Sequence, residues 1–132
     1  MKLGFIGVGN ITSDVINGIF KSKLKNCKII LSSRNKIKSK QLKKKYKKII
    51  IANSNQEVIN KSDIVFLGVL PEVGRKILPY LKFKSKQTVV SFISTIKYKE
   101  LKKIISKNVS ITRVIPMPPI SLAKGPVPIY PP

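Results

Sequence analysis

Short apolar runs alternate with segments of helical periodicity along almost the whole chain, and this alternation constrains the fold more than any other feature. The runs predict strands at residues 2–8, 27–31, 49–52, 63–69, 88–93 and 109–115. Strands that alternate with amphipathic helices build a parallel sheet that is covered on both faces. The sequence therefore predicts an α/β fold, with a Rossmann-type, doubly wound, mainly parallel sheet over residues 1–115.

The expected helices have inward faces that the periodicity identifies. A helix that starts at Asn10 is predicted to turn five apolar side chains towards the core: Ile11, Val15, Ile16, Ile19 and Phe20. A lysine-rich helix over residues 36–46 would turn Ile37, Leu42 and Tyr46 inward and leave its lysines in solvent. Ser54 and Glu57 have the spacing of a capping box, and Pro71 suits the first turn of a helix.

The C-terminal segment has a different composition from the rest of the chain. Seven of the nine prolines lie between Pro116 and Pro132, which excludes a regular helix or a central strand. We expect residues 116–132 to form a proline-rich extension, an extended arm with a short edge strand near residues 127–130. Because the chain stops in two prolines, we also expect a fragment whose arm leads to a further domain.

Composition excludes several classes of site. The chain has no histidine and a single cysteine, Cys27, so neither a zinc site nor a Cys-His pair nor an internal disulfide is expected. No apolar stretch approaches the length of about 18 residues that is needed to span a membrane. We therefore expect a cytoplasmic protein with no metal and no membrane contact.

The net charge of +22 is large for 132 residues. Such a charge attracts polyanions, but the lysines are spread along the whole chain and no nucleic-acid-binding motif accompanies them. We expect the helix over residues 36–46 to be a solvated outer face and predict no specific nucleic-acid partner. A basic nucleotide- or nucleic-acid-binding module, with Lys36–Lys48 as its contact face, stays as an alternative.

A glycine pair near the N-terminus predicts a phosphate-binding turn. Gly7 and Gly9 follow the first strand, and Thr12 stands where a third glycine would complete a dinucleotide fingerprint. Gly7 allows a tight turn, and Gly9 lets a pyrophosphate approach the backbone amides at the positive end of the helix.

The end of the second strand indicates which dinucleotide is bound. An acid at this position would bind the ribose 2′-hydroxyl of NAD, but the chain has Ser33 and Arg34. A hydroxyl and a guanidinium suit a 2′-phosphate, so NADP(H) is predicted in preference to NAD(H). Catalytic side chains stay unknown, because Ser91, Ser94 and Thr95 fit loop-capping roles at the end of the fifth strand.

Four segments resemble the pyrroline-5-carboxylate reductase family: G-F-I-G-V-G-N-I, S-S-R-N, S-D-I-V-F-L-G-V-L-P and R-V-I-P-M-P-P. The resemblance covers nearly the whole chain but only the family's first domain. It implies an NADP-binding Rossmann domain of an oxidoreductase that reduces a cyclic imine to proline. In the family, a helical second domain makes the dimer and closes the substrate pocket. We expect this domain to be missing here, so we expect no turnover by this chain alone and a homo-oligomer only where that domain is present.

The resemblance also implies a set of cofactor-binding residues, in addition to the glycine turn. They are Gly7, Val8, Gly9, Asn10, Ile11, Ser33, Arg34, Asn55, Val69, Leu70, Pro71, Phe92, Ile93 and Ser94. Leu70 replaces a lysine of the family. Met117 and Pro118 replace the family's asparagine and threonine beside the nicotinamide, which leaves the exact substrate open. Deazaflavin-dependent NADP reductases and β-hydroxyacid dehydrogenases therefore stay as alternatives.

Overall fold

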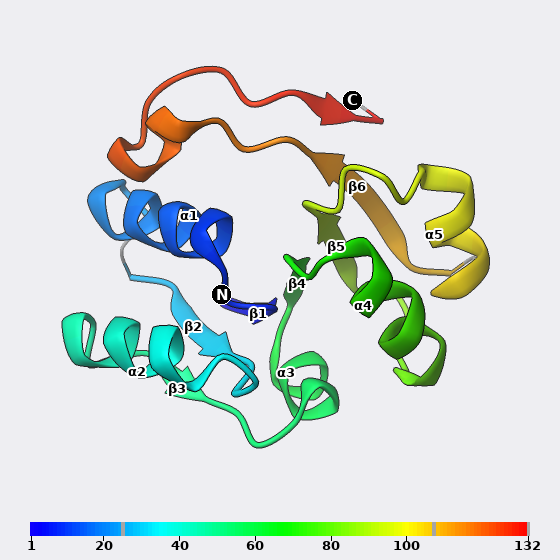
Figure 1. Ribbon diagram of the computed structural model, residues 1–132, viewed down its shortest axis with the longest axis horizontal. Coiled ribbons are helices and arrows are strands. Elements are labelled where there is room, and N and C mark those ends of the chain that lie inside the picture. The colour runs from blue at the N-terminus through cyan, green and yellow to red at the C-terminus, as the bar shows by residue number, and fades with distance from the viewer. Residues whose placement is uncertain (25, 107, 132) are drawn as a thin grey trace.

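The computed structural model describes residues 1–24, 26–106 and 108–131, and within them the chain forms one mixed sheet with helices on both faces (Figure 1). The strands are β1 (Lys2–Ile6), β2 (Lys28–Leu31), β3 (Ile50–Ile51), β4 (Ile64–Leu67), β5 (Thr88–Ser91), β6 (Ser110–Val114) and β7 (Ile129–Tyr130). The helices are α1 (Asn10–Lys21), α2 (Lys36–Lys45), α3 (Asn55–Lys61), α4 (Pro71–Ile77) and α5 (Tyr98–Ile104). Two 3-10 helices are η1 (Leu78–Tyr80) and η2 (Pro118–Leu122).

The order of the strands confirms the predicted α/β fold. It runs β3-β2-β1-β4-β5-β6-β7, with all pairs parallel except the antiparallel pair of β6 and β7. The chain first moves outward from β1 to β3 and then returns to β4 on the other side of β1. Loops at the carboxyl ends of β1 and β4 therefore diverge, and such a switch point is where open α/β sheets bind ligands.

Alternate side chains of the central strands enter two separate core clusters. Leu3 and Phe5 of β1 pack with α1 and α2, whereas Ile6 packs with α3, η1 and α5 on the opposite face. In β4, Val65 and Leu67 belong to the second of these clusters, and Phe66 stacks on Phe5 with ring centroids 4.6 Å apart. Both faces of β4 are thus covered, as its nearly continuous apolar sequence predicts.

Two helix starts have the predicted chemistry. The Ser54 hydroxyl accepts a hydrogen bond of 3.1 Å from the Glu57 backbone N–H and caps α3. Pro71 occupies the first turn of α4, where its missing N–H costs no hydrogen bond.

Two side chains that were expected in the core are exposed instead. Ile11 of α1 is 49% exposed and Ile37 of α2 is 73% exposed, whereas Val15, Ile16 and Leu42 are buried as predicted. Both exposed isoleucines lie in the first turns of their helices, at the carboxyl edge of the sheet. Periodicity identifies the apolar face of a helix but does not show where that face extends past the end of the sheet. The prediction that Ile11 and Ile37 point into the core was therefore wrong.

The segment after Ile115 folds back onto the domain and is not a free extended arm. Its 3-10 helix, η2, packs against α1, and the predicted edge strand is the two-residue β7, which pairs with β6 (Figure 1). The close packing requires Gly18, because a Cβ atom there would lie 2.0 Å from the Ile120 carbonyl oxygen. Among the described residues, no helix has the length and apolar character that would let it cross a membrane.

Candidate functional site

The turn after β1 is built around a glycine that no other residue could replace without strain. Gly7 has a φ of +92°, and a Cβ atom there would lie 2.6 Å from the backbone of Gly68. The Gly7 N–H donates to Ser32 Oγ at 3.0 Å, and Thr12 Oγ1 donates to the Gly7 carbonyl at 2.8 Å. Thr12 thus fixes the turn at the position where a third glycine was expected.

Gly9 serves a different purpose, because it provides space. It precedes α1 with a φ of −104°, a value that any residue adopts, and a Cβ atom built there meets no protein atom within 4 Å. The first turn of α1 has no acidic residue. The helix therefore presents free amides and a positive dipole end to an open space, which suits an anion such as a phosphate.

The loop after β2 is joined to the glycine turn by one asparagine. Asn35 donates from Nδ2 to the Val8 carbonyl at 2.9 Å, and its Oδ1 accepts from the Lys38 N–H at 3.2 Å. The Lys38 ammonium in turn contacts Asn10 Oδ1 at the start of α1. These bonds place the cationic start of α2 beside the glycine turn.

A groove of about 570 Å³ connects the glycine turn with the start of α2. We call it the first groove. Its lining combines apolar and cationic side chains: Gly7, Val8, Gly9, Arg34, Asn35, Lys36, Ile37, Val69, Leu70 and Val73. No acidic side chain lines it, so a ligand with several negative charges meets cations, amides and apolar groups but no carboxylate.

A second groove of about 450 Å³ continues from the glycine turn towards β5. It shares Gly9, Val69 and Leu70 with the first groove. Its lining is Gly9, Asn10, Ile11, Gly68, Val69, Leu70, Pro71, Phe92, Ile93 and Ser94. The two grooves together follow the carboxyl ends of β2, β1, β4 and β5, which is the shape that an extended dinucleotide requires.

The structure brings together most of the residues predicted to bind the cofactor. The two grooves contain Gly7, Val8, Gly9, Asn10, Ile11, Arg34, Val69, Leu70, Pro71, Phe92, Ile93 and Ser94. Ser33 and Asn55 are not among the lining residues: Ser33 stands next to the buried Ser32, and Asn55 lies in the first turn of α3. That any of these residues binds a cofactor stays a prediction.

Sequence reasoning missed several residues of the site. Ser32 and Asn35 hold the loops in place, and Lys36, Gly68 and Val73 line the grooves. Their residue types did not mark them as site residues; only their positions, directly after strands or at a helix start, could have indicated them.

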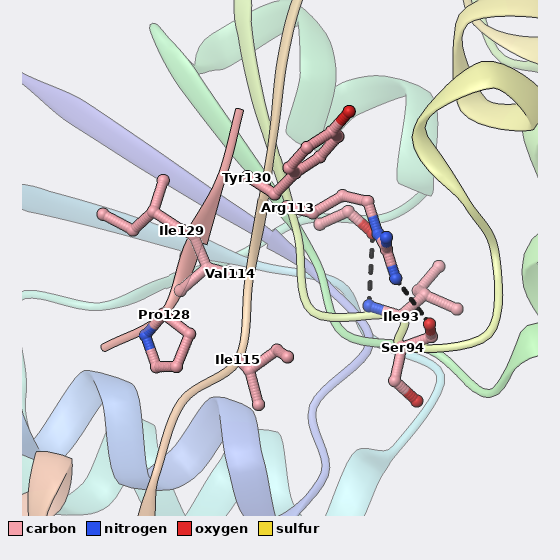
Figure 2. A pocket seen from close by; sticks show the side chains of 9 residues that line it. Ile93, Ser94, Arg113, Val114, Ile115, Pro128, Ile129 and Tyr130 are labelled. Atoms are coloured by element: carbon pink, nitrogen blue, oxygen red, sulfur yellow. Dashed lines mark hydrogen bonds between the residues drawn. The ribbon is translucent and has the colours of Figure 1, made fainter. Parts of the chain in front are cut away.

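A third and smaller pocket, of about 100 Å³, lies beside the second groove between β6, β7 and the loop after β5 (Figure 2). Ile93 and Ser94 line both the second groove and this pocket. Arg113 of β6 points from the strand towards this loop and donates from Nη2 to the Ser94 carbonyl at 2.5 Å.

Acid–base and metal chemistry have no visible source in the grooves. Two shifted pKa values belong to pairs outside them: a hydrogen bond from Lys61 lowers the pKa of Glu57, and a hydrogen bond to Glu100 raises the pKa of Arg75. Over the described parts of the chain, no cluster of three or more His, Cys, Asp or Glu side chains could hold a metal ion. The arrangement can bind and orient a ligand, which is the protein's main task where a cofactor supplies the hydride.

Comparison with known families identifies this architecture. The family model described as "NADP oxidoreductase coenzyme F420-dependent" matches residues 2–98. Among curated proteins, "Pyrroline-5-carboxylate reductase 3" of Danio rerio is 28% identical over 128 residues, which are 95% of this chain and 44% of that protein. "ComE operon protein 4" of Bacillus subtilis is 26% identical over 121 residues, 88% of this chain and 43% of that protein. The chain thus spans less than half the length of the curated relatives it matches.

A solved structure shows the same fold. The pyrroline carboxylate reductase of Plasmodium falciparum, a structure with NADP bound, aligns with a TM-score of 0.81 at 22% identity. The alignment covers 98% of this chain and 47% of that chain. The similarity therefore extends over both grooves and over the C-terminal segment that packs on α1.

Proposed function

We propose that this chain, which belongs to the NADP oxidoreductase family described as coenzyme F420-dependent, binds NADP(H) in the two grooves. Gly9 and the start of α1 would receive the pyrophosphate, and Arg34 with Lys36 would receive the 2′-phosphate. The nicotinamide half would then extend along the second groove towards Phe92 and Ser94.

One observation carries this proposal: the first groove has two cations at the end of β2 and no carboxylate. In a dinucleotide fold, an acid at that position accepts hydrogen bonds from the ribose hydroxyls of NAD, and a cation pairs with the 2′-phosphate of NADP. Arg34 and Lys36 both line the groove here. Ser33, the other residue we predicted for the phosphate, does not line it, so we assign the preference to the two cations.

Calorimetric titration with NADPH and with NADH tests the cofactor preference. We expect NADPH to bind at least about tenfold more tightly, which corresponds to about 1.4 kcal/mol. Equal affinities for the two dinucleotides would contradict the assignment of Arg34 and Lys36.

We further propose that a longer protein containing this domain reduces a cyclic imine, as the names of the pyrroline-5-carboxylate reductase relatives indicate for those proteins. The chain spans less than half of those proteins, and no acid–base pair lines its grooves. We therefore expect the 132 residues to bind NADPH without reducing pyrroline-5-carboxylate. Oxidation of NADPH that depends on this imine, with the isolated chain as the only protein, would contradict that expectation.

The family match supports a second candidate, hydride exchange between NADP(H) and a deazaflavin. Met117, which replaces the family asparagine expected at the nicotinamide, is exposed just ahead of η2 and keeps the partner substrate open. To separate the two candidate functions, a longer protein that contains this domain is given NADPH with either the imine or the deazaflavin. Oxidation of NADPH only with the imine favours imine reduction, and oxidation only with the deazaflavin favours the second candidate.

A further inference from the structure

Arg113 occupies an unusual position for a cation. It lies in β6 directly opposite Tyr130 of β7, and Tyr130 also packs edge-on against Tyr98 of α5 with ring centroids 5.9 Å apart. The side chain is half-buried: its guanidinium lies beside Tyr130 and points to the loop after β5, where its hydrogen bond to Ser94 is exposed (Figure 2). Its Nε atom is buried and has no hydrogen-bond partner.

Such an arrangement does not favour stability. A buried N–H without an acceptor costs free energy, and no carboxylate compensates it, because the ion pairs found in the described chain are Lys61 with Glu57 and Arg75 with Glu100. An apolar side chain of similar length would fill the same space without this cost. The benefit of an arginine at this position must therefore come from the bond that it does make.

That bond fixes the loop at the end of the second groove. Arg113 Nη2 holds the Ser94 carbonyl at 2.5 Å, and Ser91 Oγ accepts from the Ile93 N–H at 3.1 Å. Two hydrogen bonds thus hold two consecutive residues, and both of these residues line the second groove.

We propose that Arg113 is a positioning residue, which holds Ile93 and Ser94 in the place where the nicotinamide half of the cofactor binds. This inference rests on the proposed binding of NADP(H) and goes beyond it by assigning a role to a residue that lines neither groove. Arg34 and Lys36 lie at the other end of the site, so the adenine half of the cofactor should not depend on Arg113.

The test compares whole and half cofactors on matched variants. Calorimetry would measure the affinities of NADPH and of 2′,5′-ADP, which contains the adenosine and the 2′-phosphate but no nicotinamide, for the unmodified chain, Arg113→Met and Arg113→Lys. Arg75→Met is the control, because its exposed pair with Glu100 lies outside both grooves. Melting temperatures and the backbone amide resonances of Ile93 and Ser94 are recorded for every variant.

We expect Arg113→Met to bind NADPH about tenfold more weakly, because it loses one charged hydrogen bond. Its affinity for 2′,5′-ADP and its melting temperature should stay unchanged. Arg113→Lys should shift the two amide resonances and weaken NADPH binding less, since it keeps the charge without the planar fork. Equal losses for NADPH and 2′,5′-ADP, or unchanged binding of both, would overturn the positioning role. If the unmodified chain itself binds neither ligand, the proposed function has failed and not this inference alone.

If Arg113→Met does not fold, the positioning role is tested with Arg113→Lys alone. Amide resonances of Ile93 and Ser94 at their original positions in that variant would overturn the role, because the loop would then hold its place without the guanidinium. Displaced resonances together with weaker NADPH binding would support it.

Discussion

Gly7 and Gly9 are two residues apart, yet they meet different physical demands. Gly7 needs a left-handed backbone and close contact with the backbone of Gly68, whereas Gly9 has an ordinary φ and faces open space. The first is thus a requirement of the fold, whereas under the proposed function the second leaves room for a ligand. Replacing each glycine by alanine distinguishes these two demands experimentally.

We expect Gly7→Ala to lower the free energy of unfolding by about 2 kcal/mol or more, because a Cβ atom is strained at this φ and collides with backbone. Gly9→Ala should leave that free energy within about 0.5 kcal/mol and weaken NADPH binding, because its methyl group would stand in the groove. Chemical denaturation and calorimetry measure the two effects. Unchanged NADPH affinity in Gly9→Ala would show that the pyrophosphate does not approach this turn.

Arg34 is the residue whose replacement should change the choice of cofactor. We expect Arg34→Ser to weaken NADPH binding by about tenfold and to leave NADH binding nearly unchanged, because only NADPH carries the 2′-phosphate. Lys40→Ser removes the same charge from an exposed position of α2 that does not line the first groove. An equal loss of NADPH affinity in both variants would indicate general attraction by charge and no specific contact.

At the scale of residues, the sequence identifies groove-lining positions where the geometry demands a particular residue type. The glycines and Arg34 follow strands and line the grooves as expected, whereas Ser33 and Asn55 do not line them. A serine after a strand can point into the groove or hold the loop, and Ser32, its neighbour, does the latter. Sequence spacing does not distinguish these two orientations.

At the scale of elements, the contact between α1 and η2 determines whether replacing Gly18 by alanine raises or lowers the free energy of unfolding. Alanine in place of a helical glycine normally stabilises a helix by about 0.5–1 kcal/mol. We expect Gly18→Ala to destabilise the chain instead, because its Cβ atom would meet the backbone of Ile120. Urea denaturation measures the change, and a stabilised variant would show that η2 does not pack there.

Gly74→Ala is the matched control for this prediction. A Cβ atom at Gly74 in α4 approaches the ends of the Ile93 and Ile96 side chains at 3.1 and 3.2 Å, and flexible side chains can move by a few tenths of an ångström. We expect its effect on stability to be small.

The cap of α3 makes a small part of the stability depend on pH. The hydrogen bond from Lys61 lowers the pKa of Glu57 below its ordinary value of 4.5, with a further lowering by the Asn53 N–H. Because the folded pKa lies below the unfolded one, the stabilisation is present above about pH 4.5. It is lost as the pH falls through the folded value.

Lys61→Gln should raise the pKa of Glu57 in an NMR titration of its carboxyl group. The stability difference between the unmodified chain and this variant should be larger at pH 7 than at pH 3. An unchanged pKa of Glu57 would show that the pair does not form in solution.

Most elements are predictable because strands and helices differ in period, and all of the expected strands are found in the sheet with shorter bounds. The C-terminal segment is less predictable, because seven prolines exclude regular structure without showing where the chain goes. Its path depends on Gly18, which lies far away in sequence, and on the free edge of β6, which exists only in the folded sheet. Composition alone therefore predicts an arm, whereas tertiary contacts produce a packed 3-10 helix and a closing strand.

At the scale of the whole molecule, both grooves lie at one edge of the sheet, whereas lysines occur along the whole sequence. A separate pocket at the amino edge, lined by Phe20, Asn26, Tyr46, Lys47 and Lys48, is also cationic and offers a built-in comparison. Attraction by charge alone would favour neither edge, whereas a dinucleotide site requires the glycine turn.

The first experiment is a titration of NADPH into the isotopically labelled chain at moderate salt, followed by NMR. We expect the amide resonances of Gly9, Arg34, Leu70 and Ser94 to shift in a saturable way, while those of Tyr46 and Lys48 stay in place. Shifts confined to the lysine-rich surface that disappear with added salt, or no shifts at all, would contradict a dinucleotide site at the carboxyl edge of the sheet.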